Sequence, residues 1–121
     1  MKRDMDLIRE ILLHFEAKES PEAELSLTID GYDSKAVDYH LNLMYEAGLI
    51  EGEPFTSSTS SRVIKVIPFS LTWQGHEFLD AARDNRVWET VRGKIANAVV
   101  EVPFSLLKEL LVLTLKQHVG L

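Results

Sequence analysis

The sequence has no cysteine, and its six glycines and four prolines are few and scattered among 121 residues. The absence of cysteine excludes disulfides, thiolate metal sites and cysteine nucleophiles. Isolated glycines cannot form a glycine-rich phosphate-binding loop. The apolar content of 45% is ordinary for a globular chain, so we expect a single domain over residues 1–121 with one modest core.

Long apolar runs are also missing. Acidic residues interrupt the charged N-terminus, so the continuous apolar segment of a signal peptide does not follow it. The most apolar stretch, residues 103–119, contains Lys108, Glu109 and Lys116, and it is short and charged for a membrane span. We therefore expect a cytoplasmic protein without a membrane partner.

Positive charge is scarce in the middle of a chain whose net charge is −6. Between residues 20 and 61, eight carboxylates stand against one base, Lys35, which gives this segment a charge of −7 and leaves +1 for the rest. The eight carboxylates are those of Glu22, Glu24, Asp30, Asp33, Asp38, Glu46, Glu51 and Glu53. An acidic surface has no general attraction for nucleic acid.

Apolar periodicity predicts the elements of the N-terminal half. Residues 3–17 carry apolar side chains at spacings of three and four, as on an amphipathic helix. Residues 25–29 alternate apolar and polar side chains, which predicts a half-buried strand, and residues 30–33 form a turn. A second helix is expected over residues 34–47, ended by Gly48 in the left-handed conformation.

A β-hairpin is expected over about residues 49–67. Its first strand starts at Leu49, and residues 53–61, which end in a run of Ser and Thr, form a turn or loop. The β-branched residues 62–67 form the second strand, which Pro68 closes.

The order helix, strand, helix, hairpin is that of a winged-helix-like core over residues 1–67. Residues 72–121 form a helical extension, with helices expected over 72–83, 87–98 and 103–119. The fold class is therefore expected to be α+β, mainly α. In a winged helix, the helix before the hairpin is the recognition helix and the hairpin is the wing.

Particular motifs resemble known families. Residues 40–50, His-Leu-Asn-Leu-Met-Tyr-Glu-Ala-Gly-Leu-Ile, resemble the end of the recognition helix and the first wing strand of ArsR-like winged-helix regulators. A closer resemblance covers nearly the whole chain. The opening Met-Lys-Arg-Asp-Met-Asp, the Leu-Thr-Trp-x-Gly-His-x-Phe-Leu-Asp motif at 71–80, Arg83-Asp84 and Trp88 resemble the bacterial and phage family labelled domain of unknown function 2513. This resemblance implies a fold and no established activity, so it transfers no catalytic residue.

Side chains able to carry chemistry are dispersed. The histidines are His14, His40, His76 and His118, and no two of them are spaced as a metal-binding pair. His40 is expected to be partly buried and hydrogen-bonded, and His76 to pack locally or to bond to the backbone nearby. Trp73 and Trp88 are expected in the core. No nucleophile–base or acid–base pair is evident, so we expect no enzyme, no catalytic or metal-binding residue, no cofactor and no small-molecule ligand.

Two functions remain open. The first is a protein-interaction or regulatory module whose acidic face meets a basic partner. The alternative is a DNA-binding transcriptional regulator that contacts DNA through the wing and the later helices. The candidate nucleic-acid contacts are Arg62, Lys65, Arg83, Arg86, Arg92 and Lys94. The scarcity of positive charge favours the interaction module over DNA binding. Spacing is a second argument against DNA binding, because only residues 30–33 separate the expected strand from the second helix. This leaves little room for the extra helix of a helix-turn-helix.

The C-terminal helix has more leucine than one buried stripe needs. The leucines are Leu106, Leu107, Leu110, Leu111, Leu113 and Leu115. A helix that is apolar around much of its circumference must bury more than one face. We therefore expect a homodimer that forms through this helix.

Overall fold

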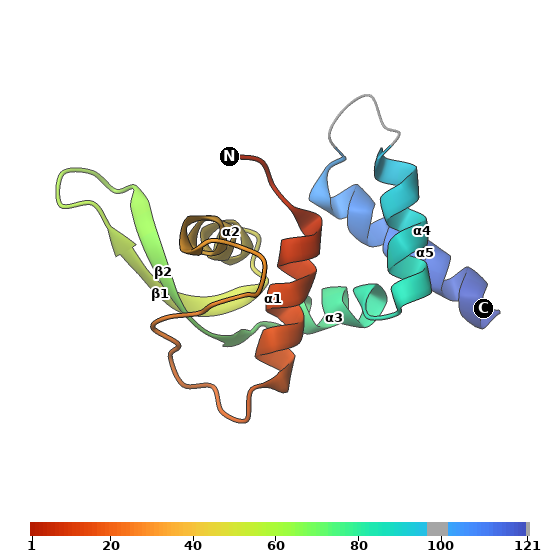
Figure 1. The fold of residues 1–121 in the computed structure, drawn as a ribbon, viewed down its shortest axis with the longest axis horizontal. Helices are drawn as coiled ribbons and strands as arrows, with labels where there is room; N and C mark the ends of the chain where they lie inside the picture. The colour runs from red at the N-terminus through yellow and green to blue at the C-terminus, as the bar shows by residue number, and fades with distance from the viewer. Residues whose placement is uncertain (97–101, 121) are drawn as a thin grey trace. The chain divides into compact units, whose positions relative to one another are not determined.

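A computed structural model describes residues 1–96 and 102–120 of the chain. Within these residues it has five α-helices and one two-stranded antiparallel sheet, so the fold is α+β and mainly α, as predicted (Figure 1). The chain divides into two compact units, Met1–His76 and Glu77–Leu121.

The first unit begins with helix α1, Met5–Ala17, as the sequence predicted. The carboxylate of Asp4 starts this helix, because it accepts hydrogen bonds from the amides of Asp6 at 2.9 Å and Leu7 at 3.2 Å. Such a cap satisfies amides that have no partner inside the helix. The buried stripe of α1 consists of Leu7, Ile8, Ile11, Leu12 and Phe15.

Helix α2, Ser34–Glu46, packs on α1 and on both strands of the sheet. It buries Val37, His40, Leu41 and Met44, the stripe that the sequence predicted. The sheet pairs β1, Ile50–Thr56, with β2, Val63–Leu71. The hairpin tip projects beyond α1 and α2 (Figure 1).

The strand predicted over residues 25–29 is wrong, because this segment is irregular. It approaches β2 through one backbone hydrogen bond, from the Glu24 amide to the Pro68 carbonyl at 2.9 Å. An antiparallel pair needs a second bond in return, and proline has no N–H to donate it. The next carbonyl, that of Phe69, accepts the Lys18 ammonium at 2.9 Å.

The boundaries of the hairpin also differ from the prediction. β1 continues to Thr56 through part of the expected loop, and β2 continues past Pro68 to Leu71. Proline fits a strand where its missing donor faces the outer edge of a sheet. The Pro68 carbonyl points away from β1 toward Glu24. Because the nitrogen and the carbonyl of one residue in an antiparallel strand face the same side, the Pro68 nitrogen also faces this outer edge.

The second unit contains most of α3, Trp73–Ala82, followed by α4, Asn85–Ala96, and α5, Phe104–Val119. Helices α4 and α5 pack against each other, and the rings of Phe78 and Phe104 stack with centroids 4.9 Å apart. The predicted core positions Phe78, Leu79, Ala82, Val87, Trp88 and Val91 are all buried. Ala98, expected on the buried face of the fourth helix, lies outside the described residues.

The core position predicted for Trp73 is wrong, because its side chain is 76% exposed. Trp73 is the first residue of α3. At roughly 100° per residue, it lies about 140° around the helix from the buried Phe78. Of the two alternatives expected for His76, local packing is wrong, because this side chain is exposed.

Candidate functional site

Backbone hydrogen bonds link the C-terminal end of α2 to the residues just before and just after the hairpin. Gly48 adopts a φ of 75°, which allows the Leu49 amide to reach the Met44 carbonyl at 2.9 Å. This is the glycine cap that the sequence predicted. The Leu49 carbonyl then accepts the Thr72 amide at 3.0 Å. The C-terminal end of α2 is therefore tied to the two ends of the hairpin.

His40 is a structural residue of α2. Its side chain is 2% exposed. The Nε2 atom accepts a hydrogen bond from the Asp4 amide at 2.7 Å. The Nδ1 atom lies 2.7 Å from the Ala36 carbonyl oxygen. An amide can only donate and a carbonyl can only accept, so the ring is neutral with its proton on Nδ1. The predicted burial and hydrogen bonding of His40 are confirmed, and both ring nitrogens are occupied.

The outward side of α2 is acidic. We call the exposed carboxylates of Asp33, Asp38 and Glu46 the acidic α2 face. The Asp33 carboxylate also caps the helix, since it accepts the Ala36 amide at 2.8 Å. Lys35 is the only lysine or arginine of this helix. The face that points away from the core thus has more negative than positive charge.

Further carboxylates lie at the start of α1, near the turn that precedes α2. Burial raises the pKa of Tyr32, and the nearby negative charges of Asp4, Asp6 and Glu10 raise it further. A raised tyrosine pKa is expected where the phenolate would meet other anions. The carboxylates of Asp4, Asp6 and Glu10 therefore lie close to the turn that precedes α2.

The hairpin presents the two bases that the sequence assigned to the wing. Arg62 and Lys65 are both exposed, and none of the described carboxylates forms an ion pair with them. Lys65 lies opposite Phe55, whereas Glu53 lies two residues further along the same face of the sheet. Lys65 therefore shares its face of the sheet with a carboxylate.

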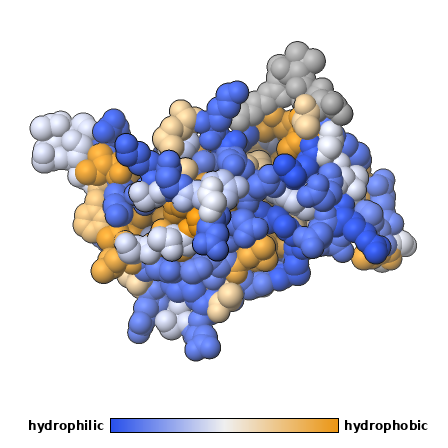
Figure 2. All heavy atoms as spheres, viewed as in Figure 1, coloured by the Kyte–Doolittle hydropathy of each residue, from blue (hydrophilic) through white to orange (hydrophobic). Residues whose placement is uncertain are grey.

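Backbone and hydroxyl groups both form hydrogen bonds at the hairpin tip. The Ser57 amide bonds to the Arg62 carbonyl at 2.9 Å, and the Ser60 hydroxyl accepts the Arg62 amide at 3.2 Å. The pale atoms at the left edge of Figure 2 are this Ser/Thr-rich tip, and apolar atoms adjoin them. The exposed large apolar side chains of the hairpin are Phe55 and Ile64.

The other four predicted nucleic-acid contacts belong to the second unit. Arg83 pairs with Asp80 at 3.0 Å and Arg92 pairs with Glu89 at 3.5 Å, each one helical turn apart. Arg86 and Lys94 are exposed. Two of these four bases therefore already have a carboxylate neighbour, and exposed pairs of this kind contribute little to stability.

The leucines of α5 differ widely in exposure. Leu107 and Leu111 are buried in the chain, at 2% and 0% exposure, whereas Leu106 and Leu113 are 43% and 53% exposed. Leu110 and Leu115 are half-buried. Two of the six residues predicted for a partner surface are thus already covered.

A cluster around Lys18 was missed by the sequence reasoning. Its ammonium donates to the Glu22 and Phe69 carbonyls and lies 3.7 Å from the Glu24 carboxylate. Glu24 also contacts His14 at 2.8 Å. These contacts hold the segment after α1 against β2, so the cluster has a structural role.

The described residues offer little for other classes of site. No three His, Asp or Glu side chains in residues 1–96 and 102–120 are arranged to hold a metal ion. In the same part of the chain, every helix is too short or too polar to cross a lipid bilayer.

Comparison with known proteins gives two matches. The family described as "Hypothetical protein (DUF2513)" matches residues 2–101. An "Uncharacterized protein" of Haemophilus influenzae (strain ATCC 51907 / DSM 11121 / KW20 / Rd) is 39% identical over 112 residues, which cover 90% of this chain and 91% of that protein. No solved structure is significantly similar.

Proposed function

Because the chain belongs to the family described as "Hypothetical protein (DUF2513)", whose description assigns no activity, we propose its function from the surface of α2. We propose that the chain is a non-catalytic, winged-helix-like interaction module. Its acidic α2 face binds a basic surface of a protein partner.

The position of α2 supports the comparison with a winged helix. It lies directly before the hairpin, ends in the glycine cap at Gly48, and buries its inner stripe against both strands. A recognition helix has the same place before the wing. Residues 18–33 contain no helix, so the first helix of a standard helix-turn-helix has no counterpart here.

The charge of the outward side of α2 is the observation that carries the proposal. Duplex DNA is bound mainly by lysine and arginine that neutralise phosphates. In the major groove, the acidic α2 face would bring Asp33, Asp38 and Glu46 toward the phosphates, with only Lys35 to offset them. The same carboxylates are attracted to a basic protein surface, where complementary charge increases the association rate and selects the partner.

A charge-reversal pair tests this proposal. The variant Asp38→Lys with Glu46→Lys reverses two carboxylates of the acidic α2 face. The matched control, Glu19→Lys with Glu22→Lys, makes the same change in charge at two exposed residues of the loop after α1. Each immobilised protein is used to capture partners from a lysate of a bacterium that encodes it.

The proposal predicts that the wild-type chain and the control variant retain the same basic protein. The α2 variant should retain at least about tenfold less, since a tenfold change corresponds to about 1.4 kcal/mol. If the α2 variant retains the partner as well as the wild type does, the acidic α2 face is not the binding surface.

One observation favours a second candidate, DNA binding through the wing. Arg62 and Lys65 project from the hairpin and pair with none of the described carboxylates. Titration of a fluorescent mixed-sequence duplex at about 50–100 mM salt would detect such binding. DNA binding through the wing requires that affinity falls as salt rises and that Arg62→Ala with Lys65→Ala weakens it.

A further inference from the structure

Helix α5 leaves one face of the second unit uncovered. Leu107, Leu111 and Thr114 are buried on its opposite side. The uncovered face carries Glu109, Leu113 and Lys116, all exposed, and is bordered by the half-buried Val112 and Lys108.

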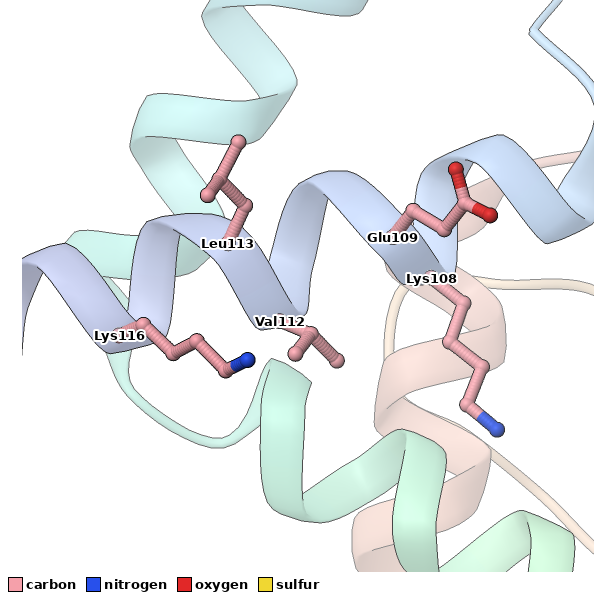
Figure 3. A pocket seen from close by; sticks show the side chains of 5 residues that line it. All are labelled: Lys108, Glu109, Val112, Leu113 and Lys116. Carbon is pink, nitrogen blue, oxygen red and sulfur yellow. The ribbon is translucent and has the colours of Figure 1, made fainter. Parts of the chain in front are cut away.

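These five residues line a hollow of about 300 Å³. They form two rows along the helix, in which neighbours within a row are four residues apart. Figure 3 shows Lys108, Val112 and Lys116 extending to one side of the α5 axis and Glu109 and Leu113 to the other. An apolar pair, Val112 and Leu113, thus lies at the centre of the face, with Glu109 toward one end and Lys116 toward the other.

The charges of Glu109 and Lys116 are not satisfied within the helix. They are seven positions apart, which is about 10 Å along an α-helix and too far for a direct ion pair. Neither side chain forms an ion pair with another described residue. Each therefore has a charge free to meet an opposite charge on a neighbouring molecule.

We propose that this face binds the same face of a second copy of the chain, with the two α5 helices antiparallel. A two-fold axis between Val112 and Leu113 puts Glu109 of each copy opposite Lys116 of the other. The same axis puts Val112 opposite Leu113 of the other copy. Two-fold interfaces require such self-complementarity, because one patch must meet itself.

Charge selects this arrangement over a parallel one. In a parallel pair, Glu109 would meet Glu109 of the other copy and Lys116 would meet Lys116, so both contacts would be repulsive. The antiparallel pair makes two attractive contacts around an apolar centre. This interface differs from the leucine set predicted from sequence, because Leu107 and Leu111 are covered within the chain. It does not rest on the proposed function of α2.

A charge swap tests the pairing in the full-length chain. Sedimentation equilibrium of the wild type should give a concentration-dependent dimer. Glu109→Lys or Lys116→Glu alone converts both attractive contacts into repulsive ones and should weaken the dimer about tenfold, equivalent to about 1.4 kcal/mol. Glu109→Lys combined with Lys116→Glu should restore the wild-type constant, and far-UV circular dichroism checks that each variant is folded.

A wild-type chain that stays monomeric up to about 1 mM would overturn the proposal, since that limit leaves less than about 4 kcal/mol of association free energy. Single variants with an unchanged constant, or a double variant that does not recover, would overturn the pairing of Glu109 with Lys116.

Cysteine cross-linking tests the antiparallel direction, because the natural chain has no cysteine. Leu113→Cys lies beside the two-fold axis and should give a disulfide-linked dimer on mild oxidation. Leu106→Cys, an exposed leucine of the same helix, is the matched control. In the antiparallel pair its two copies would be about 20 Å apart along the helix axes. Efficient cross-linking through residue 106 would contradict the proposed direction.

Discussion

The first turn of α3 passes so close to the end of α2 that residue 75 has no room for a side chain. A Cβ atom built on Gly75 would lie 2.1 Å from the Leu49 carbonyl oxygen and 3.1 Å from its carbon. That carbonyl is held in place, because it accepts the Thr72 amide at 3.0 Å. The Thr72 hydroxyl in turn donates to the Gly48 carbonyl. Rotation of a side chain therefore cannot relieve the clash.

Gly75→Ala should lower the free energy of unfolding by about 2 kcal/mol. Overpacking costs about 1–3 kcal/mol, and we take the upper end because the neighbour is backbone. The better helix propensity of alanine offsets about 1 kcal/mol of this cost. The result is a clear net loss, even though alanine normally strengthens a helix.

Urea unfolding followed by circular dichroism measures this loss. Gly93→Ala is the matched control, because Gly93 lies in α4 and a Cβ atom there would have no contact within 4 Å. This control should gain about 0.5–1 kcal/mol. If Gly75→Ala were as stable as wild type or behaved like Gly93→Ala, the close approach of α3 to α2 would be refuted.

Two further predictions concern the helix starts. His40→Phe removes the acceptor of the Asp4 amide. It should lower the free energy of unfolding in urea by about 1–3 kcal/mol. An unchanged unfolding midpoint would contradict the structural role of His40. Hydrogen bonds from the Val87 and Arg86 amides lower the pKa of Asp84, so its carboxylate stabilises the fold above its unfolded pKa of about 3.9. This contribution is lost as the pH falls through the lower pKa of the folded state. Asp84→Ala should therefore lower Tm at neutral pH, with a smaller difference in acid, and a difference that does not change with pH would argue against this cap.

Much of the fold could be predicted from local sequence. The apolar stripes of α1 and α2 have helical spacing, and Asp33 and Gly48 are residues that commonly start and end a helix. The wrong predictions concern segments whose conformation depends on residues far away in the sequence. The alternation of residues 25–29 is strand-like, but the neighbouring strand offers Pro68 at the position where pairing would start.

The candidate surfaces were predictable to different degrees. The acidic character of the α2 segment follows from composition alone, because almost no lysine or arginine lies near it in the sequence. The pairs of Arg83 with Asp80 and Arg92 with Glu89 could have been found, since three-residue spacing places both members on one helix face. The contacts of Lys18 with Phe69 and of His14 with Glu24 join separate segments, and nothing local in the sequence marks them.

We expect that the outward side of α2 does not bind nucleic acid, although the helix lies directly before a wing-like hairpin. NMR spectra of the ¹⁵N-labelled chain, titrated with a mixed-sequence duplex at low salt, test it residue by residue. The amide signals of Lys35, Asp38 and Glu46 should not shift, even if those of the hairpin do. Saturating shifts along α2 that disappear as salt is added would contradict it.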